Sequence, residues 1–461
     1  MHRRQWQFGS IGEAAICLAA IVLRTLAMNA FPGNMLDDRD NYLGLAHGIV
    51  EGAGFQNEFT GEPTAFRPPL YPLLIAAVQQ IDGPRTLGIL QCILGGLTAW
   101  LVFRTARGLG LGGLAFLAGL FVALDPILLQ YTTFPMTESF CAFLTALLLS
   151  VIAKGWMRES SEDPLAVTDS ARLSENAETI SMPIGKQWLV GVLFGLCVLS
   201  RPTYWSFGVI VALVWSMRWF QSGRVVQSVP KWMLVAVAIT VSPWVVRNMI
   251  TLGHPILMTT HGGYTLLLGN NPMFYAEEVS QPWGTVWEDA APERSQEAWY
   301  RETLAEITRE LGDDADEVAV DRWMSRRARE HIVENPGLFA RACVLRFVRF
   351  WSIVPSRPAR GHVSPPLLLG IGAYNAVVFI GFLIGLIATL LRRFPREWWF
   401  PALLVAAFSI THLIYWSNAR MRAPVIPGIA LISALGWSQL ARGRGPSRNG
   451  RTAANSTDRK A

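Results

Sequence analysis

Ten apolar runs divide this chain, and they constrain its fold more than any other feature. The runs are 11–31, 86–106, 112–132, 138–157, 187–200, 203–220, 232–250, 367–391, 400–416 and 423–440. Roughly 20 apolar residues cross the hydrocarbon core of a bilayer as a helix, and a helix satisfies its own backbone hydrogen bonds there. We therefore predict an all-α polytopic membrane protein with about ten transmembrane helices.

The composition agrees with this class of protein. Hydrophobic residues make up 51% of the chain and charged residues only 16%, whereas about a quarter are charged in an average soluble domain. The net charge of +6 does not indicate a nucleic-acid partner, because the excess arginine lies in short loops between apolar runs. The cysteines have no CxxC spacing. We expect them to behave as small buried apolar residues and to form neither a disulfide framework nor a metal site.

The basic residues predict which side of the membrane each loop faces. Arg3 and Arg4 precede the first run and an acidic loop follows it, so the positive-inside rule places the N-terminus in the cytoplasm. When the predicted crossings are counted along the chain, the arginine clusters at 392–396 and 442–448 also fall on the cytoplasmic side. We expect a multi-pass protein of the cell inner (plasma) membrane with both termini cytoplasmic and an active site on the extracytoplasmic face.

Within the first outer loop, residues 32–85, we expect the chemistry in the stretch from Asp37 to Pro72. It is polar and rich in Gly and Pro, although it joins apolar runs. Apolar residues at helical spacing over 42–49 predict a short helix on the membrane surface, which Gly52 and Gly54 would end. Residues 70–82 hold about a dozen apolar residues, fewer than a span needs, so we expect a re-entrant or juxtamembrane segment.

The chain divides into five parts by composition. They are an N-terminal transmembrane module at 1–250, a disordered cytoplasmic loop within it at 158–187, an extracytoplasmic segment at 251–366, C-terminal transmembrane helices at 367–440 and a disordered cytoplasmic tail at 441–461.

The extracytoplasmic segment has its own pattern. Glycines and asparagines over 261–272 indicate tight turns. Residues 295–311 and 315–334 alternate apolar and charged residues at helical spacing, which predicts two amphipathic helices. The run 338–354 is apolar but carries three arginines, so we expect it to lie in the membrane interface.

Charged residues gather at the predicted outer ends of the spans. They are Asp37, Asp38, Asp40, Arg67, Glu138, Arg201, Arg247, Arg420 and Arg422. Ionisable groups at the membrane edge are costly, which makes a functional site the first hypothesis. Arginine forks bind phosphate oxygens bidentately, and a carboxylate can take a proton from an attacking hydroxyl or amine. The pattern therefore favours a phosphate-bearing lipid substrate and an acceptor group that is activated.

Each of these residues also has a structural interpretation. The first-loop aspartates could cap the short helix, and Glu138 could favour a helix N-terminus through the dipole. The arginines could extend to lipid headgroups as anchors. The histidines show no metal spacing, and GLGLGG at 108–113 joins two apolar runs without a preceding strand, so we interpret it as a turn and not a dinucleotide site.

Several short motifs, taken in order, resemble the type C (GT-C) membrane glycosyltransferases. They are the acidic pair Asp37 and Asp38 with Tyr42, RPPLYP at 67–72, LSRP at 199–202, PWVVRN at 243–248, GGYTLLLGNNP at 262–272 and RMRAPVIP at 420–427. The similarity is greatest to the bacterial group related to protein O-mannosyltransferases and lipid A aminoarabinose transferases, and covers about residues 10–440.

The resemblance implies a polyprenyl-phosphate-linked sugar donor, an extracytoplasmic acceptor (lipid, glycan or protein) and inversion at the sugar carbon. By position, Asp38 would be the general base, and Asp37 or Asp40 would assist it. Glu138 would assist with sugar or metal. A divalent metal stays open, because polyprenyl phosphate is already a competent leaving group.

The resemblance also implies a set of substrate-binding residues. Arg67 would hold the lipid phosphate, and Arg420 or Arg422 would be a second phosphate contact. The other residues that we assign to this set are Tyr42, Tyr71, Arg201, Arg247 and Asn248, which belong to the same motifs. The sugar, a hexose or a pentose, is not specified. A transporter or flippase of lipid-linked sugars is the alternative, although charge spread through the helices and a repeat of halves, which it predicts, are not seen.

Overall fold

The structure is a computed structural model that describes residues 2–58, 60–157, 182–222, 230–356, 363–391 and 396–443. Most of the predicted cytoplasmic loop at 158–187 and of the tail at 441–461 lies outside these residues. Within the described ranges the elements are helices, and one isolated antiparallel bridge pairs Gln56 with Pro63. The predicted all-α class is confirmed.

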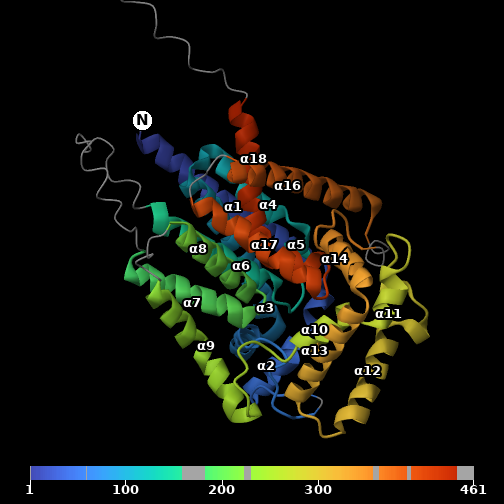
Figure 1. The fold of residues 1–461 in the computed structure, drawn as a ribbon. Coiled ribbons are helices and arrows are strands. Elements are labelled where there is room, and N and C mark those ends of the chain that lie inside the picture. The colour runs from blue at the N-terminus through green and yellow to red at the C-terminus, as the bar shows by residue number, and fades with distance from the viewer. Residues whose placement is uncertain are drawn as a thin grey trace, which may run out of the picture.

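The apolar runs fold into a bundle with one continuous core (Figure 1). Its helices are α1 (His2–Ala30), α3 (Leu70–Ala106), α4 (Ala115–Leu124), α5 (Pro126–Tyr131), α6 (Glu138–Met157), α7 (Ile184–Ser200), α8 (Tyr204–Ser222), α9 (Lys231–Leu252), α16 (Pro365–Leu391), α17 (Trp399–Ile414) and α18 (Ile426–Gly443). Helix α3 packs against α1, α4 and α6, while α7 pairs with α9 and α16 with α18.

Among the residues that the structure describes, five helical segments are long and apolar enough to cross a membrane. They are Gly12–Ala30, Leu70–Leu124, Lys231–Leu252, Pro365–Leu391 and Ala419–Ala441. Shorter apolar helices cover Glu138–Ala153, Ile184–Ser200, Tyr204–Met217 and Trp399–Ile414. The protein is a multi-pass membrane protein, while the number of crossings and their sidedness stay predictions.

One break in the helices falls at the boundary between the predicted segments 70–82 and 86–106, and another falls inside a single predicted run. Residues 70–81 form the first part of α3, and the chain kinks at Asp82 and Gly83, whose backbone angles are not helical, before it continues to Ala106. The predicted single run 112–132 breaks at Asp125, which is extended and precedes Pro126. A residue before proline is disfavoured in the helical region, so the helix ends there and α5 begins anew.

The GLGLGG stretch is a tight connection, as predicted. A π-helical turn over Arg107–Leu111 is followed by a 3-10 turn over Gly112–Leu114. Gly110 and Gly112 have φ of 84° and 58°, a left-handed conformation that glycine adopts without steric cost. The stretch reverses the chain between α3 and α4.

The segment that the sequence predicts to be extracytoplasmic, and that keeps this name below, forms in its described part a second helical unit beside the bundle (Figure 1). It contains α10 (Gly262–Gly269), α11 (Pro272–Phe274), α12 (Gln296–Leu311), α13 (Glu317–Glu334) and α14 (Pro336–Phe350) around its own core of tryptophans. The two amphipathic helices are confirmed by α12 and α13. The prediction of tight turns over 261–272 is wrong for most of its length, because 262–269 is helical and the chain turns only at its two ends, at His261 and at Asn270–Asn271.

The first outer loop begins with a 3-10 helix, η1 (Pro32–Leu36), and continues with a short α-helix, α2 (Tyr42–Val50), which packs against α3. Gly52 and Gly54 follow it, both with φ of 83°, and they end the helix as the sequence predicted. The loop therefore returns to α3 through residues 51–69, alongside the extracytoplasmic segment.

Candidate active site

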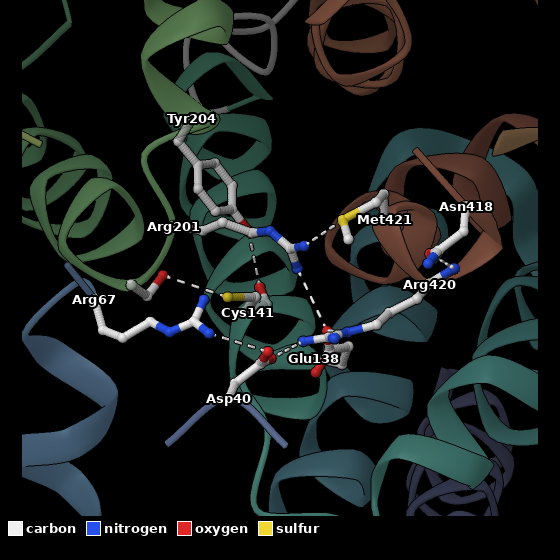
Figure 2. Close-up of polar contacts among 10 residues, drawn as sticks. Asp40, Arg67, Glu138, Cys141, Arg201, Tyr204, Asn418, Arg420 and Met421 are labelled. Atoms are coloured by element: carbon white, nitrogen blue, oxygen red, sulfur yellow. Dashed lines mark hydrogen bonds and ion pairs between the residues drawn. The ribbon is translucent and has the colours of Figure 1, made fainter. Parts of the chain in front are cut away.

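Five charged side chains meet where the first outer loop, α6, the α7–α8 junction and the segment before α18 converge (Figure 2). They alternate in sign, in the order Arg67, Asp40, Arg420, Glu138 and Arg201. We call these five residues the charge network. It joins residues up to 380 positions apart in the chain.

Arg420 occupies the centre of the charge network. Its Nε donates a hydrogen bond of 2.5 Å to Glu138 Oε1, and its Nη2 donates to Asp40 Oδ2. Asp40 Oδ1 in turn accepts from Arg67 Nη2 at 3.3 Å. Arg201 Nη1 lies 3.6 Å from Glu138 Oε1, within ion-pair range but beyond hydrogen-bonding distance.

Neighbouring residues in the sequence restrict the backbone conformation at or beside each arginine of the charge network. Pro68 and Pro69 follow Arg67 and restrict the backbone immediately before α3. Arg201 is extended because Pro202 follows it, and the helix therefore breaks between α7 and α8. Asn418 caps the 3-10 helix η8 (Ala419–Val425) by accepting from Arg420 N, which sets the start of the turn that carries Arg420.

The charge network is buried and incompletely satisfied. The Glu138 side chain is fully buried, and those of Asp40, Arg67, Arg201 and Arg420 are 13–18% exposed. Arg67 Nε, Arg201 Nη1 and Glu138 Oε2 are buried without a hydrogen-bond partner. Buried polar atoms are nearly always hydrogen-bonded in proteins, so unpaired donors on two arginines indicate capacity for an anion.

The net charge of the network is +1, because three arginines face two carboxylates. Burial raises the pKa of Asp40, but the charges of Arg420 and Arg67 outweigh it and hold that pKa below its ordinary value. Asp40 is therefore an anion that keeps Arg67 and Arg420 together, and it is a weak proton acceptor.

Asp38 has a different environment only two residues away. Its carboxylate accepts three backbone N–H bonds at the start of α2, from Tyr42 at 2.7 Å, Leu43 at 2.8 Å and Gly44 at 3.0 Å. Burial raises the pKa of Asp38, and these three hydrogen bonds oppose that shift without cancelling it. Asn41 has a φ of 57°, and this left-handed residue turns the chain between Asp40 and the start of α2.

Asp37 lies outside the charge network. It forms an exposed ion pair of 2.8 Å with Arg39, and both side chains are more than 40% exposed. Exposed pairs of this kind contribute little to stability.

Tyrosines form the walls around the charge network. The Tyr42 and Tyr71 rings meet edge to face at 5.2 Å, and the Arg67 guanidinium lies 5.7 Å from the Tyr42 ring. Tyr71 Oη is buried without a hydrogen-bond partner. On the opposite side the Arg420 guanidinium lies 5.4 Å from the Tyr131 ring.

Three of the predicted site residues lie elsewhere. Arg247 donates hydrogen bonds of 2.7 Å to the carbonyls of Thr64 and Phe55, and Asn248 donates to Ile256 O. They therefore anchor the loops. Arg422 is buried, and it donates to Phe350 O at 2.8 Å and Ser352 O at 3.2 Å.

His261 approaches the charge network, although the sequence offered no argument for it. Its ring lies 4.4 Å from that of Phe66, next to Arg67. Burial, followed by the Arg67 charge, lowers the pKa of His261 to about 3, so the ring is neutral at physiological pH. An isolated histidine in a glycine-rich stretch gives no local pattern, and only the fold brings it to Phe66.

Asp125 is a second residue that the sequence analysis did not single out. It is buried, caps α5 by accepting from Ile127 N and Leu128 N at 3.0 Å, and lies 3.3 Å from Tyr374 Oη. The signal was present, because an aspartate before a proline inside an apolar run marks a helix break.

Metal ligation was left open by the sequence. In the part of the chain that the structure describes, no group of three His, Cys, Asp or Glu side chains lies close enough to hold an ion. The two network carboxylates face arginines instead.

Comparison with known proteins gives one family match. Residues 66–168 match the family model described as dolichyl-phosphate-mannose-protein mannosyltransferase. This range includes Arg67, Tyr71 and Glu138. The match confirms the resemblance to type C membrane glycosyltransferases that the motifs indicated. A search of curated protein sequences finds no match.

A comparison with solved structures gives further matches, of low identity. The oligosaccharyltransferase AglB from Archaeoglobus fulgidus, in complex with an inhibitory peptide and a dolichol-phosphate, matches 96% of this chain and 53% of its own, with 14% identity and a TM-score of 0.46. ArnT from Cupriavidus metallidurans, bound to undecaprenyl phosphate, matches 93% of this chain and 78% of its own, with 12% identity and a TM-score of 0.38. The chain thus spans about half the length of the AglB structure.

Proposed function

We propose that this protein is an integral membrane glycosyltransferase that moves a sugar from a polyprenyl-phosphate donor to an extracytoplasmic acceptor. The observation that carries the proposal is the charge network, whose three arginines exceed its two carboxylates and keep buried N–H groups unpaired. The family match supports a lipid-phosphate-linked sugar, since its description names dolichyl-phosphate-mannose.

The donor phosphate binds at the arginines. Arg67 and Arg201 stand at the two ends of the network and carry its unpaired N–H groups, so they are available to phosphate oxygens. Asp40 and Glu138 hold Arg420 between them and keep these charges in place before the donor arrives. A preorganised cluster of this kind stabilises charge that develops on the leaving group without reorganising during the reaction.

The reaction is a single displacement. A hydroxyl or amine of the acceptor attacks the anomeric carbon, the bond from that carbon to the phosphate oxygen breaks, and its electron pair leaves with polyprenyl phosphate. The nucleophile's proton passes to a carboxylate. Attack opposite the leaving phosphate inverts the sugar carbon.

Asp38 is the proposed general base. Pairs of titratable groups whose environments move their pKa values apart indicate how acid and base roles are divided. Burial raises the pKa of Asp38, which makes it the better proton acceptor, whereas the arginines lower that of Asp40. The backbone bonds to Asp38 leave one carboxylate lone pair free, on Oδ1, because each oxygen has two and Oδ2 accepts from both Leu43 N and Gly44 N.

Reconstitution of the purified protein in liposomes tests the proposed function. Radiolabelled sugars on polyprenyl phosphate are supplied with extracts of envelope lipid, glycan and protein as acceptors, and wild type is compared with Asp38→Asn. We expect wild type to transfer label and the variant to lose transfer while it still binds polyprenyl phosphate. Asp37→Asn is the control, because Asp37 is an exposed neighbour. Movement of the intact donor across the bilayer without transfer would contradict the proposal and favour a flippase.

A further inference from the structure

Glu317, the first residue of α13, joins the extracytoplasmic segment to the first outer loop through its carboxylate. Thr64 Oγ1 donates to Glu317 Oε2 at 2.5 Å, and Ala65 N donates to Oε1 at 2.9 Å. Thr260 Oγ1 also donates to Oε1. One side chain therefore holds two segments that lie 253 and 57 residues away in the chain. We call Glu317 and these three donors the clasp.

Neighbouring contacts hold the same two segments together. Thr260 N donates to Ala65 O at 3.1 Å, so the segments also bond to each other. One helical turn after Glu317, Asp321 accepts from Gly263 N at 2.6 Å. Residues i and i+4 share a helix face, so the first turns of α13 present two carboxylates to loop donors.

The clasp lies directly beside the charge network. Ala65 precedes Arg67 by two residues, and Thr260 immediately precedes His261. The Phe66 ring contacts His261 at 4.4 Å, and the Arg67 guanidinium lies 5.2 Å from the Phe66 ring. Arg67 is thus fixed on one side by the clasp and on the other by Pro68 and Pro69.

The donors at the clasp are buried. Thr64 and Thr260 are 3% and 5% exposed, and hydrogen bonds to a charged acceptor are stronger than those between neutral groups. A single carboxylate with three donors is more than a helix start requires, because the Asp316 side chain already caps α13 by accepting from Ala319 N at 2.6 Å.

We propose that Glu317 is a positioning residue for the donor-phosphate site, acting through the segment 64–67 on Arg67. The inference rests on the proposed function, in which Arg67 binds the donor phosphate. Loss of the clasp allows the Arg67 side chain to change its orientation, while Asp38, Asp40 and Glu138 keep their positions. The affinity for the lipid phosphate then falls more than the rate of the chemical step.

The test uses Glu317→Ala and Glu317→Gln in the full-length protein. Glu317→Ala is expected to raise the donor KM about tenfold or more with kcat within about threefold of wild type, the pattern expected when binding is lost equally from the ground and transition states. Glu317→Gln keeps one acceptor oxygen, so its donor KM is expected to lie between those of wild type and Glu317→Ala. Glu330→Ala on the same helix is the control, because its carboxylate lies outside the clasp and forms an ion pair of 3.2 Å with Arg327, one turn earlier in the helix.

A second variant tests the same contact from the loop side, in case Glu317→Ala does not fold. Thr64→Val removes one donor on the loop side and leaves α13 unchanged. Its effect on donor KM should not add fully to that of Glu317→Ala, because Glu317→Ala already removes the Thr64 contact. Thermal unfolding midpoints identify any variant that is merely destabilised.

Binding of polyprenyl phosphate alone separates this inference from the proposed function. If wild type binds the lipid and Glu317→Ala binds it at least about tenfold more weakly, the positioning role holds even when no sugar transfer is found. If folded Glu317→Ala has the donor KM and lipid affinity of wild type, the positioning role is overturned, whether or not the protein is a transferase.

Discussion

Arg420 and Glu138, which lie 282 residues apart in the chain, are joined by an ion pair of 2.5 Å in the interior of the protein. Glu138 begins α6 and is fully buried, and Arg420 lies in the short helix before α18. This pair joins the N-terminal and C-terminal halves of the chain at the centre of the charge network.

Replacing Arg420 separates its structural and functional contributions. Arg420→Ala leaves Asp40 and Glu138 less compensated, and breaking a buried pair costs about 3–5 kcal/mol. We expect a clear fall in the thermal unfolding midpoint together with loss of transfer. Arg420→Lys keeps the charge but loses the planar fork, so it should retain much of the stability and lose most of the activity. An alanine variant as stable as wild type would contradict the ion pair.

Asp38→Asn removes the proposed base. General base catalysis contributes about 10²–10⁴-fold, so kcat should fall by that factor while the donor KM changes little. The amide can accept fewer backbone N–H bonds at the start of α2, and the unfolding midpoint is measured beside the kinetics to detect any loss of that cap. Unchanged kcat in Asp38→Asn would remove Asp38 from catalysis.

The pH dependence of kcat/KM follows from the Asp38 shift. A base works when deprotonated, and burial raises the pKa of Asp38, so activity should fall as the pH drops through a value above the ordinary aspartate pKa of about 3.9. Asp40, whose pKa is lowered, would give no fall in that range. A pH–rate profile that stays flat down to pH of about 4 would rule out Asp38 as the base.

Stability in acid follows from Asp40. Its pKa is lower in the folded protein, where the Arg420 and Arg67 charges outweigh burial, so its stabilisation is complete above the ordinary aspartate pKa and disappears as the pH falls through the folded value. The unfolding midpoint of wild type should decrease below pH of about 4, and that of Asp40→Asn should depend less on pH. If the unfolding midpoints of wild type and Asp40→Asn depend equally on pH, Asp40 is not the source of the acid sensitivity.

Because α16 packs closely on α18, an added methyl group at a glycine between them should destabilise the protein. A Cβ at Gly385 would collide with the carbonyl oxygen of Ile432, whereas a Cβ at Gly370 on the same helix meets nothing within 4 Å. Overpacking costs about 1–3 kcal/mol, so Gly385→Ala should lower the unfolding midpoint and Gly370→Ala should not. Similar midpoints for the two variants would show that the helices separate easily.

Much of the fold could be predicted from hydrophobic patterning. The apolar runs fall on helices, and α2, α12 and α13 appear where the periodicity placed them. The breaks were harder to predict. Asp125 interrupts an apolar run by preceding a proline, and 262–269 is helical despite its glycines because it packs on α13.

The site was partly predictable for a similar reason. Arg67, Glu138, Arg201 and Arg420 all lie at span ends, and the fold brings them together with Asp40. Sequence position alone did not separate Arg420 from Arg422. Residues two apart in a 3-10 helix, which has three residues per turn, point to different sides, so one enters the charge network and the other holds backbone carbonyls.

The central claim is that the charge network binds the phosphate of the donor, and the affinity for polyprenyl phosphate tests it most directly. The Kd is measured for purified wild type, Arg67→Ala, Arg201→Ala and, as a control, Arg39→Ala, whose side chain is exposed on the same loop as Asp40. We predict that the Kd rises at least about tenfold in the first two variants, a loss of about 1.4 kcal/mol each, and does not change in the control. The same Kd in all four proteins would contradict the account.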